Sequence, residues 1–258
     1  MRKLKGTFFM SGHSKWATIK HKKGAADARR GKIFTKLIKE ITVAARIGGG
    51  DVDANPRLRT AVNAAKAENM PADNIKRAMQ KGTGELPGTT YEECVYEAYG
   101  PGGVAMMVEV TTDNKNRTTS EIRHIFAKHG GTFGASVAWI FHKKGYVVVE
   151  KGKADEEKLL ELVTDAGADD MNDDGSNWEI LSTPENFHNV VERLKAAQIT
   201  TAAAEVSMVP QNYVKLSGKQ ADQMLRLMDE LEDHEDVSHV YANFDIEETE
   251  LHALTQTK

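Results

Sequence analysis

Residues 91–112 have the sequence YEECVYEAYGPGGVAMMVEVTT, and this stretch decides the fold class. Apolar and polar side chains alternate on either side of the turn sequence at 100–103, which is typical of a β-hairpin. We therefore expect strands over Tyr91–Tyr99 and Val104–Thr112. A helix is expected next, with Thr118 as its N-cap and a glutamate three positions later, as in a capping box. A strand-strand-helix unit cannot close a sheet alone, so further strands must come from elsewhere in the chain.

The sequence before the hairpin has a helical period instead. Between residues 25 and 47 apolar side chains recur on one arc of a helical wheel, and three glycines at 48–50 end the pattern. Asn55 followed by Pro56 predicts the start of a second helix. A third helix is expected from about Pro71 to Gly82. This part of the chain is therefore predicted to be a small helical bundle.

The sequence after the hairpin predicts two more groups of elements. The first group has the order ββαβαβ, with strands at Val137–Phe141 and Tyr146–Glu150, a helix at Ala154–Ala166, a strand at Trp178–Leu181, a helix at Pro184–Gln198 and a strand at Ala204–Val209. The second has the order βαβ, with a strand at Tyr213–Leu216, a helix at Lys219–Glu232 and a strand at Val237–Ile246. Joined to the hairpin and its helix, the second group repeats the order of the first. One α/β domain is therefore expected to be inserted into another.

The predicted fold class is α+β multidomain, an N-terminal helical bundle plus two ferredoxin-like-type α/β domains, one inserted in the other. The expected domains are a basic N-terminal arm at 1–24, the helical bundle at 25–82, a split α/β domain at 83–134 plus 210–248, an inserted α/β domain at 135–209 and a tail at 249–258.

Charge is distributed very unevenly along the chain. Residues 1–82 contain 19 Lys and Arg against 6 Asp and Glu, a net charge of +13, whereas the whole chain carries −4. A segment with this excess of cations is suited to nucleic acid, because each cation set against a phosphate releases condensed counterions. The alternative is a basic module that docks on the acidic remainder of its own chain.

The candidate contacts to nucleic acid form two groups. The first is a basic stripe in the arm and the first helix, with one aromatic side chain that either stacks on a base or anchors the arm on protein. Its members are Lys15, Trp16, Lys20, His21, Lys22, Lys23, Arg29, Arg30, Lys32, Lys36 and Lys39. The second group, Lys115, Asn116 and Arg117, is expected at a helix N-terminus, where backbone amides attract anions. The alternative for the second group is a polar loop that only holds the turn.

Other chemistries find little support in the sequence. A single cysteine excludes a Cys-rich zinc site, and the partial calcium-loop pattern at 170–175 lacks its final carboxylate. We therefore expect no cofactor, no metal, no small-molecule substrate and no enzymatic activity. The rival hypothesis is an enzyme that uses the cleft between the α/β domains, with His124 or His129 near Arg117 as acid or base. No apolar run is long enough to span a bilayer, and a cytoplasmic protein is expected, starting at either Met1 or Met10.

Several separated blocks of the sequence together resemble the YebC family, also called PmpR-like regulators. These blocks are GHSKW at 12–16 with IKHKK at 19–23, NMP at 69–71 with NI at 74–75, YEAYGPGG at 96–103 and TDNKNRT at 112–118. The resemblance covers nearly the whole chain from Met10 onward. It implies a helical bundle followed by two α/β domains and a role as a DNA-binding transcriptional regulator. The family also includes bacterial and mitochondrial translation factors that act at the ribosome.

The function expected from the sequence is a non-enzymatic, nucleic-acid-binding regulator of gene expression. The alternative is a ribosome-associated translation factor that binds rRNA and relieves stalling. Backbone contacts carry no base information, so the cations alone do not separate DNA from rRNA. The sequence likewise leaves open the sequence specificity, the regulated genes and the oligomeric state.

Overall fold

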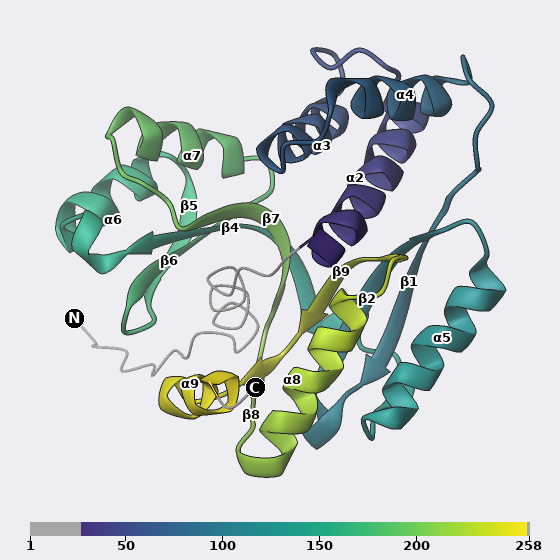
Figure 1. The fold of residues 1–258 in the computed structure, drawn as a ribbon. Helices are drawn as coiled ribbons and strands as arrows, with labels where there is room; N and C mark the ends of the chain where they lie inside the picture. The colour runs from purple at the N-terminus through teal and green to yellow at the C-terminus, as the bar shows by residue number, and fades with distance from the viewer. Residues whose placement is uncertain (1–26, 257–258) are drawn as a thin grey trace. The chain divides into compact units, whose positions relative to one another are not determined.

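The computed structural model describes residues 27–256, and it has the mixed α/β, multidomain architecture that the sequence predicts (Figure 1). The described residues fall into two compact units. The large unit comprises 27–137 and 217–242, and the small unit comprises 138–216 and 243–256. Residues 210–216 and 243–248 thus group with the inserted segment, and the five-part division of the chain stays a prediction. No helix within the described range is long and apolar enough to cross a membrane.

The helical bundle of the large unit consists of α2 (Asp27–Gly48), α3 (Pro56–Ala67) and α4 (Ala72–Thr83). The predicted start of α3 is confirmed, because the Asn55 side chain accepts a hydrogen bond from the backbone N–H of Leu58 and Pro56 is the first helical residue. The helices share one apolar core, whose buried members are Ile41, Ala44, Ala45, Leu58, Ala61, Val62, Ala65, Met70, Ile75 and Ala78. The bundle therefore has a core of its own.

The predicted hairpin forms the middle of an antiparallel sheet in the large unit. Strands β1 (Glu92–Tyr99) and β2 (Ala105–Thr112) pair along their whole length across a short helical turn, η1 (Pro101–Gly103). The sheet order is β3-β1-β2-β9, with β3 at Thr132–Phe133 and β9 at Val237–Ala242. Helices α5 (Lys115–Lys128) and α8 (Gly218–Glu232) contact each other and bury their apolar faces (Figure 1).

The N-terminus of α5 corrects the predicted cap. Asn114, not Thr118, is the N-cap residue, and its side chain accepts a hydrogen bond from the backbone N–H of Arg117 at 3.1 Å. Thr118 lies one turn inside the helix and is fully buried. Asn is as good a cap as Thr, so the sequence pattern alone favoured the wrong residue.

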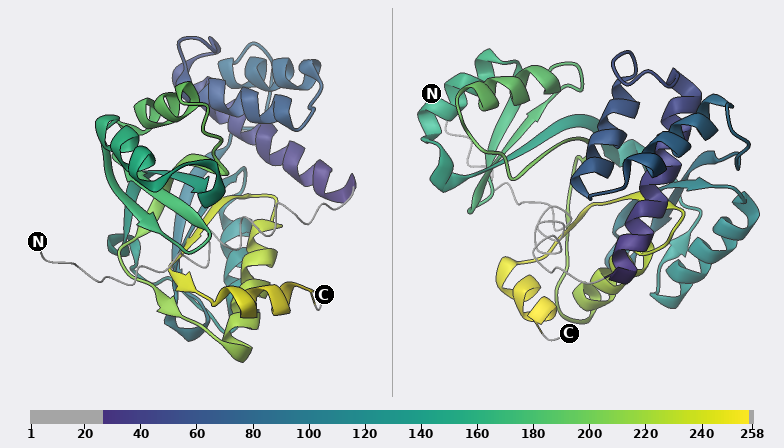
Figure 2. Two further views of the ribbon diagram at one scale, coloured as in Figure 1. Left: turned by 90° about the vertical axis from the view of Figure 1, so that its left-hand side faces the viewer. Right: turned by 45° about the horizontal axis from the view of Figure 1, so that its top comes forward.

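The small unit has a second antiparallel sheet, of order β5-β6-β4-β7. Its elements are η2 (Ala138–Ile140), β4 (Phe141–Glu150), η3 (Lys151–Lys153), α6 (Glu156–Asp165), β5 (Ala168–Asp173), β6 (Asn177–Ser182), α7 (Phe187–Ala196) and β7 (Ala203–Pro210). Buried side chains of α6 and α7 pack on β4 and β6 to form its core, and Figure 2 shows both helices from two further directions. The unit also contains a two-stranded parallel ladder of β8 (Val214–Lys215) and β10 (Phe244–Asp245), followed by α9 (Glu248–Gln256).

The order of elements in the inserted segment is βαββαβ, not the predicted ββαβαβ. Two expected strands are one, because β4 continues through Lys143 and Lys144 and pairs with β7 across that stretch. Gly145 lies within this strand and pairs with Ser182 and Val206, and the position requires glycine because a Cβ there would lie 2.7 Å from the Cβ of Phe187. The strand β5 was missed because its acidic residues have low β-propensity.

Candidate nucleic-acid interface

Much of the predicted basic stripe lies outside the described residues. Lys15, Trp16, Lys20, His21, Lys22 and Lys23 precede residue 27, where the description begins. Arg29 and Arg30 belong to the first turn of α2, but their side chains are outside the description as well. For these eight residues the predicted contact with nucleic acid stays a prediction.

The lysines further along α2 contact their own unit. The Lys36 ammonium donates to the backbone carbonyl of Glu232. Lys39 is 8% exposed, and its ammonium donates to the carbonyl of Glu235 at 3.1 Å and to the carboxylate of Asp236. Lys36 therefore contacts the last residue of α8 and Lys39 the segment between α8 and β9, as in the alternative in which the basic module docks on its own chain.

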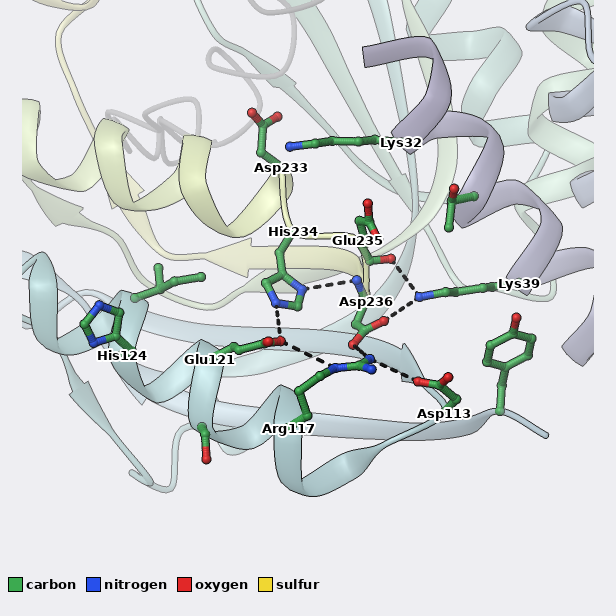
Figure 3. Close-up of a pocket in the computed structure, with 14 residues that line it drawn as sticks. Lys32, Lys39, Asp113, Arg117, Glu121, His124, Asp233, His234, Glu235 and Asp236 are labelled. Carbon is green, nitrogen blue, oxygen red and sulfur yellow. Dashed lines mark hydrogen bonds and ion pairs between the residues drawn. The ribbon is translucent and has the colours of Figure 1, made fainter. Parts of the chain in front are cut away.

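Asp236 is the centre of this contact (Figure 3). Its carboxylate is 4% exposed and accepts hydrogen bonds from Lys39, from Arg117 at 2.7 Å and from the Thr118 hydroxyl at 2.6 Å. A further hydrogen bond comes from the Thr112 hydroxyl at 3.2 Å. Burial alone would raise the pKa of Asp236, but the hydrogen bonds from Lys39, Thr118 and Arg117 outweigh it and hold the pKa well below its usual range. Asp236 is therefore a carboxylate at neutral pH.

The side chain of Arg117, in the first turn of α5, contacts carboxylates of the same chain. Besides Asp236, the guanidinium of Arg117 contacts Asp113 at 3.0 Å and Glu121 at 3.8 Å. Lys115 and Asn116 are exposed beside it. Arg117 is therefore already paired, whereas Lys115 and Asn116 are still open to solvent.

Lys39, Arg117 and Asp236 line an open groove of about 890 Å³ between α2, α5 and the segment that joins α8 to β9. Three of its side chains are cations: Lys32, Lys39 and Arg117. Five are carboxylates, namely Asp113, Glu121, Asp233, Glu235 and Asp236. With neutral histidines the lining carries a net charge of −2, which repels a polyanion. The groove itself is thus poorly suited to phosphate.

Of the two histidines that the rival enzyme hypothesis offers as alternatives, one lines the groove together with Arg117. His124 lines the groove, whereas His129 lies outside the lining and pairs with Glu230 at 2.7 Å. A third histidine, His234, bridges two groups: its Nδ1 accepts from the backbone N–H of Asp236, and its Nε2 contacts Glu121 at 3.1 Å. Within the described range, no group of three or more His, Cys, Asp or Glu side chains is disposed to hold a metal ion.

A set of free cations that the sequence did not single out lies on α3 and α4. Within the described part of the chain these side chains are exposed and make no hydrogen bond or ion pair: Arg59, Lys66, Lys76 and Lys81. Helix α3 contains no acidic residue, and α4 contains only Asp73. The signal was present in the sequence, since these cations contribute to the net charge of +13 and lie outside the apolar stripes of their helices.

Known proteins resemble this chain over nearly its full length. The family model described as the TACO1/YebC protein N-terminal domain matches residues 14–85, and the model of the TACO1/YebC second and third domain matches 91–244. A "probable transcriptional regulatory protein" of Koribacter versatilis is 63% identical over 94% of this chain and 98% of the relative. One of Geobacter sp. strain M21 is 58% identical over 95% of this chain and 100% of the relative.

A solved structure shows the same fold. The crystal structure of a conserved hypothetical protein from Aquifex aeolicus matches with a TM-score of 0.77 and 47% identity, covering 90% of this chain and 96% of that one. Matches of this extent in sequence and structure establish descent from a common ancestor. The chain belongs to the TACO1/YebC family.

Proposed function

We propose that this protein is a non-enzymatic regulator of gene expression that acts in the cytoplasm by binding nucleic acid through its basic leading segment. The names of the bacterial relatives, probable transcriptional regulatory proteins, support a regulatory role in transcription. The observation that carries the proposal is the set of four exposed, unpartnered cations on α3 and α4. A surface that keeps its cations away from internal carboxylates is available to phosphates.

The same cations support a second polyanion as the target. Lys and Arg contacts to phosphates position a protein but carry no base information, so duplex DNA and rRNA on the ribosome would both be bound by this surface. A ribosome-associated translation factor is therefore the alternative form of the proposal. Direct comparison of the two ligands at matched ionic strength decides between them.

The proposal is tested by the salt dependence of binding. The variant R59Q/K66Q/K76Q/K81Q removes the four cations of α3 and α4, and its matched control, K143Q/K153Q/K158Q/R193Q, removes four exposed cations from the small unit. Binding of random duplex DNA and of ribosomes is measured from 50 to 200 mM salt. If all four cations contact duplex phosphates, the slope of log K against log salt becomes shallower by about 3.6.

The control variant keeps the slope of the natural protein, although its net charge changes by the same amount. Equal losses in the two variants would mean that only overall charge matters, and the proposed surface would then be wrong. Ribosome binding that depends on the α3 and α4 cations, without comparable binding to random duplex, would select the translation alternative.

A further inference from the structure

The helical bundle of the large unit contacts the rest of that unit through basic side chains. We call this rest the sheet layer: it comprises the sheet β3-β1-β2-β9, the helices α5 and α8, and the segments that connect them. Lys36 and Lys39 on α2 reach the segment between α8 and β9, as described above. Arg46, near the end of α2, donates to the backbone carbonyl of Tyr91 at 2.6 Å. Arg57 on α3 contacts Glu93 of β1 at 2.6 Å. Four cations of the bundle thus contact backbone carbonyls or carboxylates of the sheet layer.

The apolar core of the bundle does not extend into this contact. Its buried members lie between Ile41 and Ala78, and the half-buried side chains packed against them lie between Phe34 and Met79. The connection from the bundle to β1, residues 84–90, is exposed throughout. The ionic contacts therefore help to hold the two parts together, beside Val43, which is buried on the same face of α2 but is not a member of the bundle core.

We propose that this contact is an ionic clasp centred on Asp236, and that phosphates open it by competing for the cations of the bundle and for Arg117. The competition with phosphates rests on the proposed function, whereas the clasp itself does not. Lys36 and Lys39 then have two alternative partners, acceptors on the sheet layer in the closed form and phosphates in the open form, whereas Arg57 is also paired with Glu40 of its own bundle.

Asp236 is the decisive member of the clasp because it is the most buried. The Arg57 ion pair is 40% exposed on the arginine side, so solvent screens it and its loss changes little. Lys39 and Asp236 are both nearly inaccessible to water. If Asp236 becomes Asn, the ammonium of Lys39 is left buried without an opposite charge, and opening the contact is the way to rehydrate it.

The first experiment measures the distance between the two parts in the full-length chain. Paired spin labels are placed at exposed positions of α3 and β3, A64C and T132C, in a C94A background. We expect a narrow distance distribution for the otherwise natural sequence and a shift to longer, broader distances for D236N. A distribution that stays narrow in D236N at both 50 mM and 1 M salt would overturn the clasp. Unchanged helicity by circular dichroism shows that the bundle, which has its own core, is still folded.

The second experiment measures affinity for a single-stranded polynucleotide as a function of salt. D236N frees Lys39 for phosphates, whereas Arg117 keeps Asp113 and Glu121 as partners, and one added contact to a single strand steepens the slope of log K against log salt by about 0.7. K39M is the matched control, because it breaks the same contact but removes the cation. We expect no steeper slope for K39M, because the ammonium that D236N leaves unpaired is absent from it.

The outcomes separate the clasp from the proposed function. Absence of binding by the natural protein would refute the proposed function, while the label distances would still test the clasp. Opening of D236N without a steeper slope would refute the competition by phosphates. A steeper slope in D236N, together with label distances that lengthen when the polynucleotide is added to the natural protein, would support the whole proposal.

Discussion

Asn55 joins the end of α2 to the start of α3, and its replacement gives the sharpest test of how the bundle is built. Its side chain is 5% exposed. The carbonyl oxygen accepts from the backbone N–H of Leu58 at 3.1 Å, and the amide nitrogen donates to the carbonyls of Ala44 and Gly49, each at 2.9 Å. One amide group therefore satisfies three backbone groups at two helix ends.

The change Asn55→Ala removes all three hydrogen bonds. Loss of an N-cap of this kind costs about 1 kcal/mol. Each carbonyl left without its donor adds about 1 kcal/mol, because both lie at least partly inside the bundle. We expect the free energy of unfolding to fall by about 3 kcal/mol, which is roughly 6–12 °C in the melting temperature of a unit of this size.

Urea denaturation followed by circular dichroism measures this loss, with Asn63→Ala on the exposed face of α3 as the matched control. That control should change the unfolding free energy by no more than about 0.5 kcal/mol. Asn55→Asp separates the cap from the two donated bonds, because a carboxylate can cap α3 but cannot donate to Ala44 and Gly49. If Asn55→Asp were as stable as the natural protein, the two donated bonds would carry no energy and the reasoning would fail.

Two further predictions concern packing and pH. Gly82→Ala should cost about 1–3 kcal/mol of unfolding free energy, because the new Cβ would clash with the carbonyl oxygen of Thr42 and lie 2.7 Å from the Cβ of Ala45. The control is Gly31→Ala, where no atom lies within 4 Å of the new Cβ and no loss of stability is expected. Equal losses of unfolding free energy in the two variants would contradict this account. Since the pKa of Asp236 is lower in the native state than in the unfolded chain, its stabilising contribution is complete above about pH 4 and is lost as the pH falls through the native pKa. Urea titration measures the difference in unfolding free energy between the natural protein and Asp236→Asn. This difference should be constant from about pH 5 to 8 and shrink in stronger acid. If it already shrinks as the pH falls from about 8 to 5, another group is titrating.

The parts of the fold that depend on near neighbours in sequence were predictable. The buried stripe of α3 follows from the helical period of Leu58, Ala61, Val62 and Ala65, and its start follows from Asn55 and Pro56. The hairpin at 92–112 follows from two short runs rich in strand-forming residues on either side of a glycine-rich turn. In each case the deciding interactions lie within a few residues of one another.

The parts that depend on distant partners were not predictable. Lys39 reads as an exposed cation on a helical wheel, yet its partner Asp236 lies 197 residues away in the sequence. Lys143 and Lys144 read as a break between strands, but pairing with β7 keeps them in one strand. The cations of α3 and α4 add to the net charge of the leading segment, but whether a carboxylate lies near them depends on the packing of distant parts of the chain.

The pairing of β2 with β9 has a consequence for the order in which a nascent chain acquires its sheets. All four strands of the small unit's sheet have been synthesised once Pro210 is made, whereas β2 must wait for Val237–Ala242. Until then the apolar strand β2 is an edge with unpaired backbone amides and carbonyls, a template for pairing with other chains. Premature termination between these points should therefore yield an aggregation-prone product whose inserted sheet is nevertheless complete.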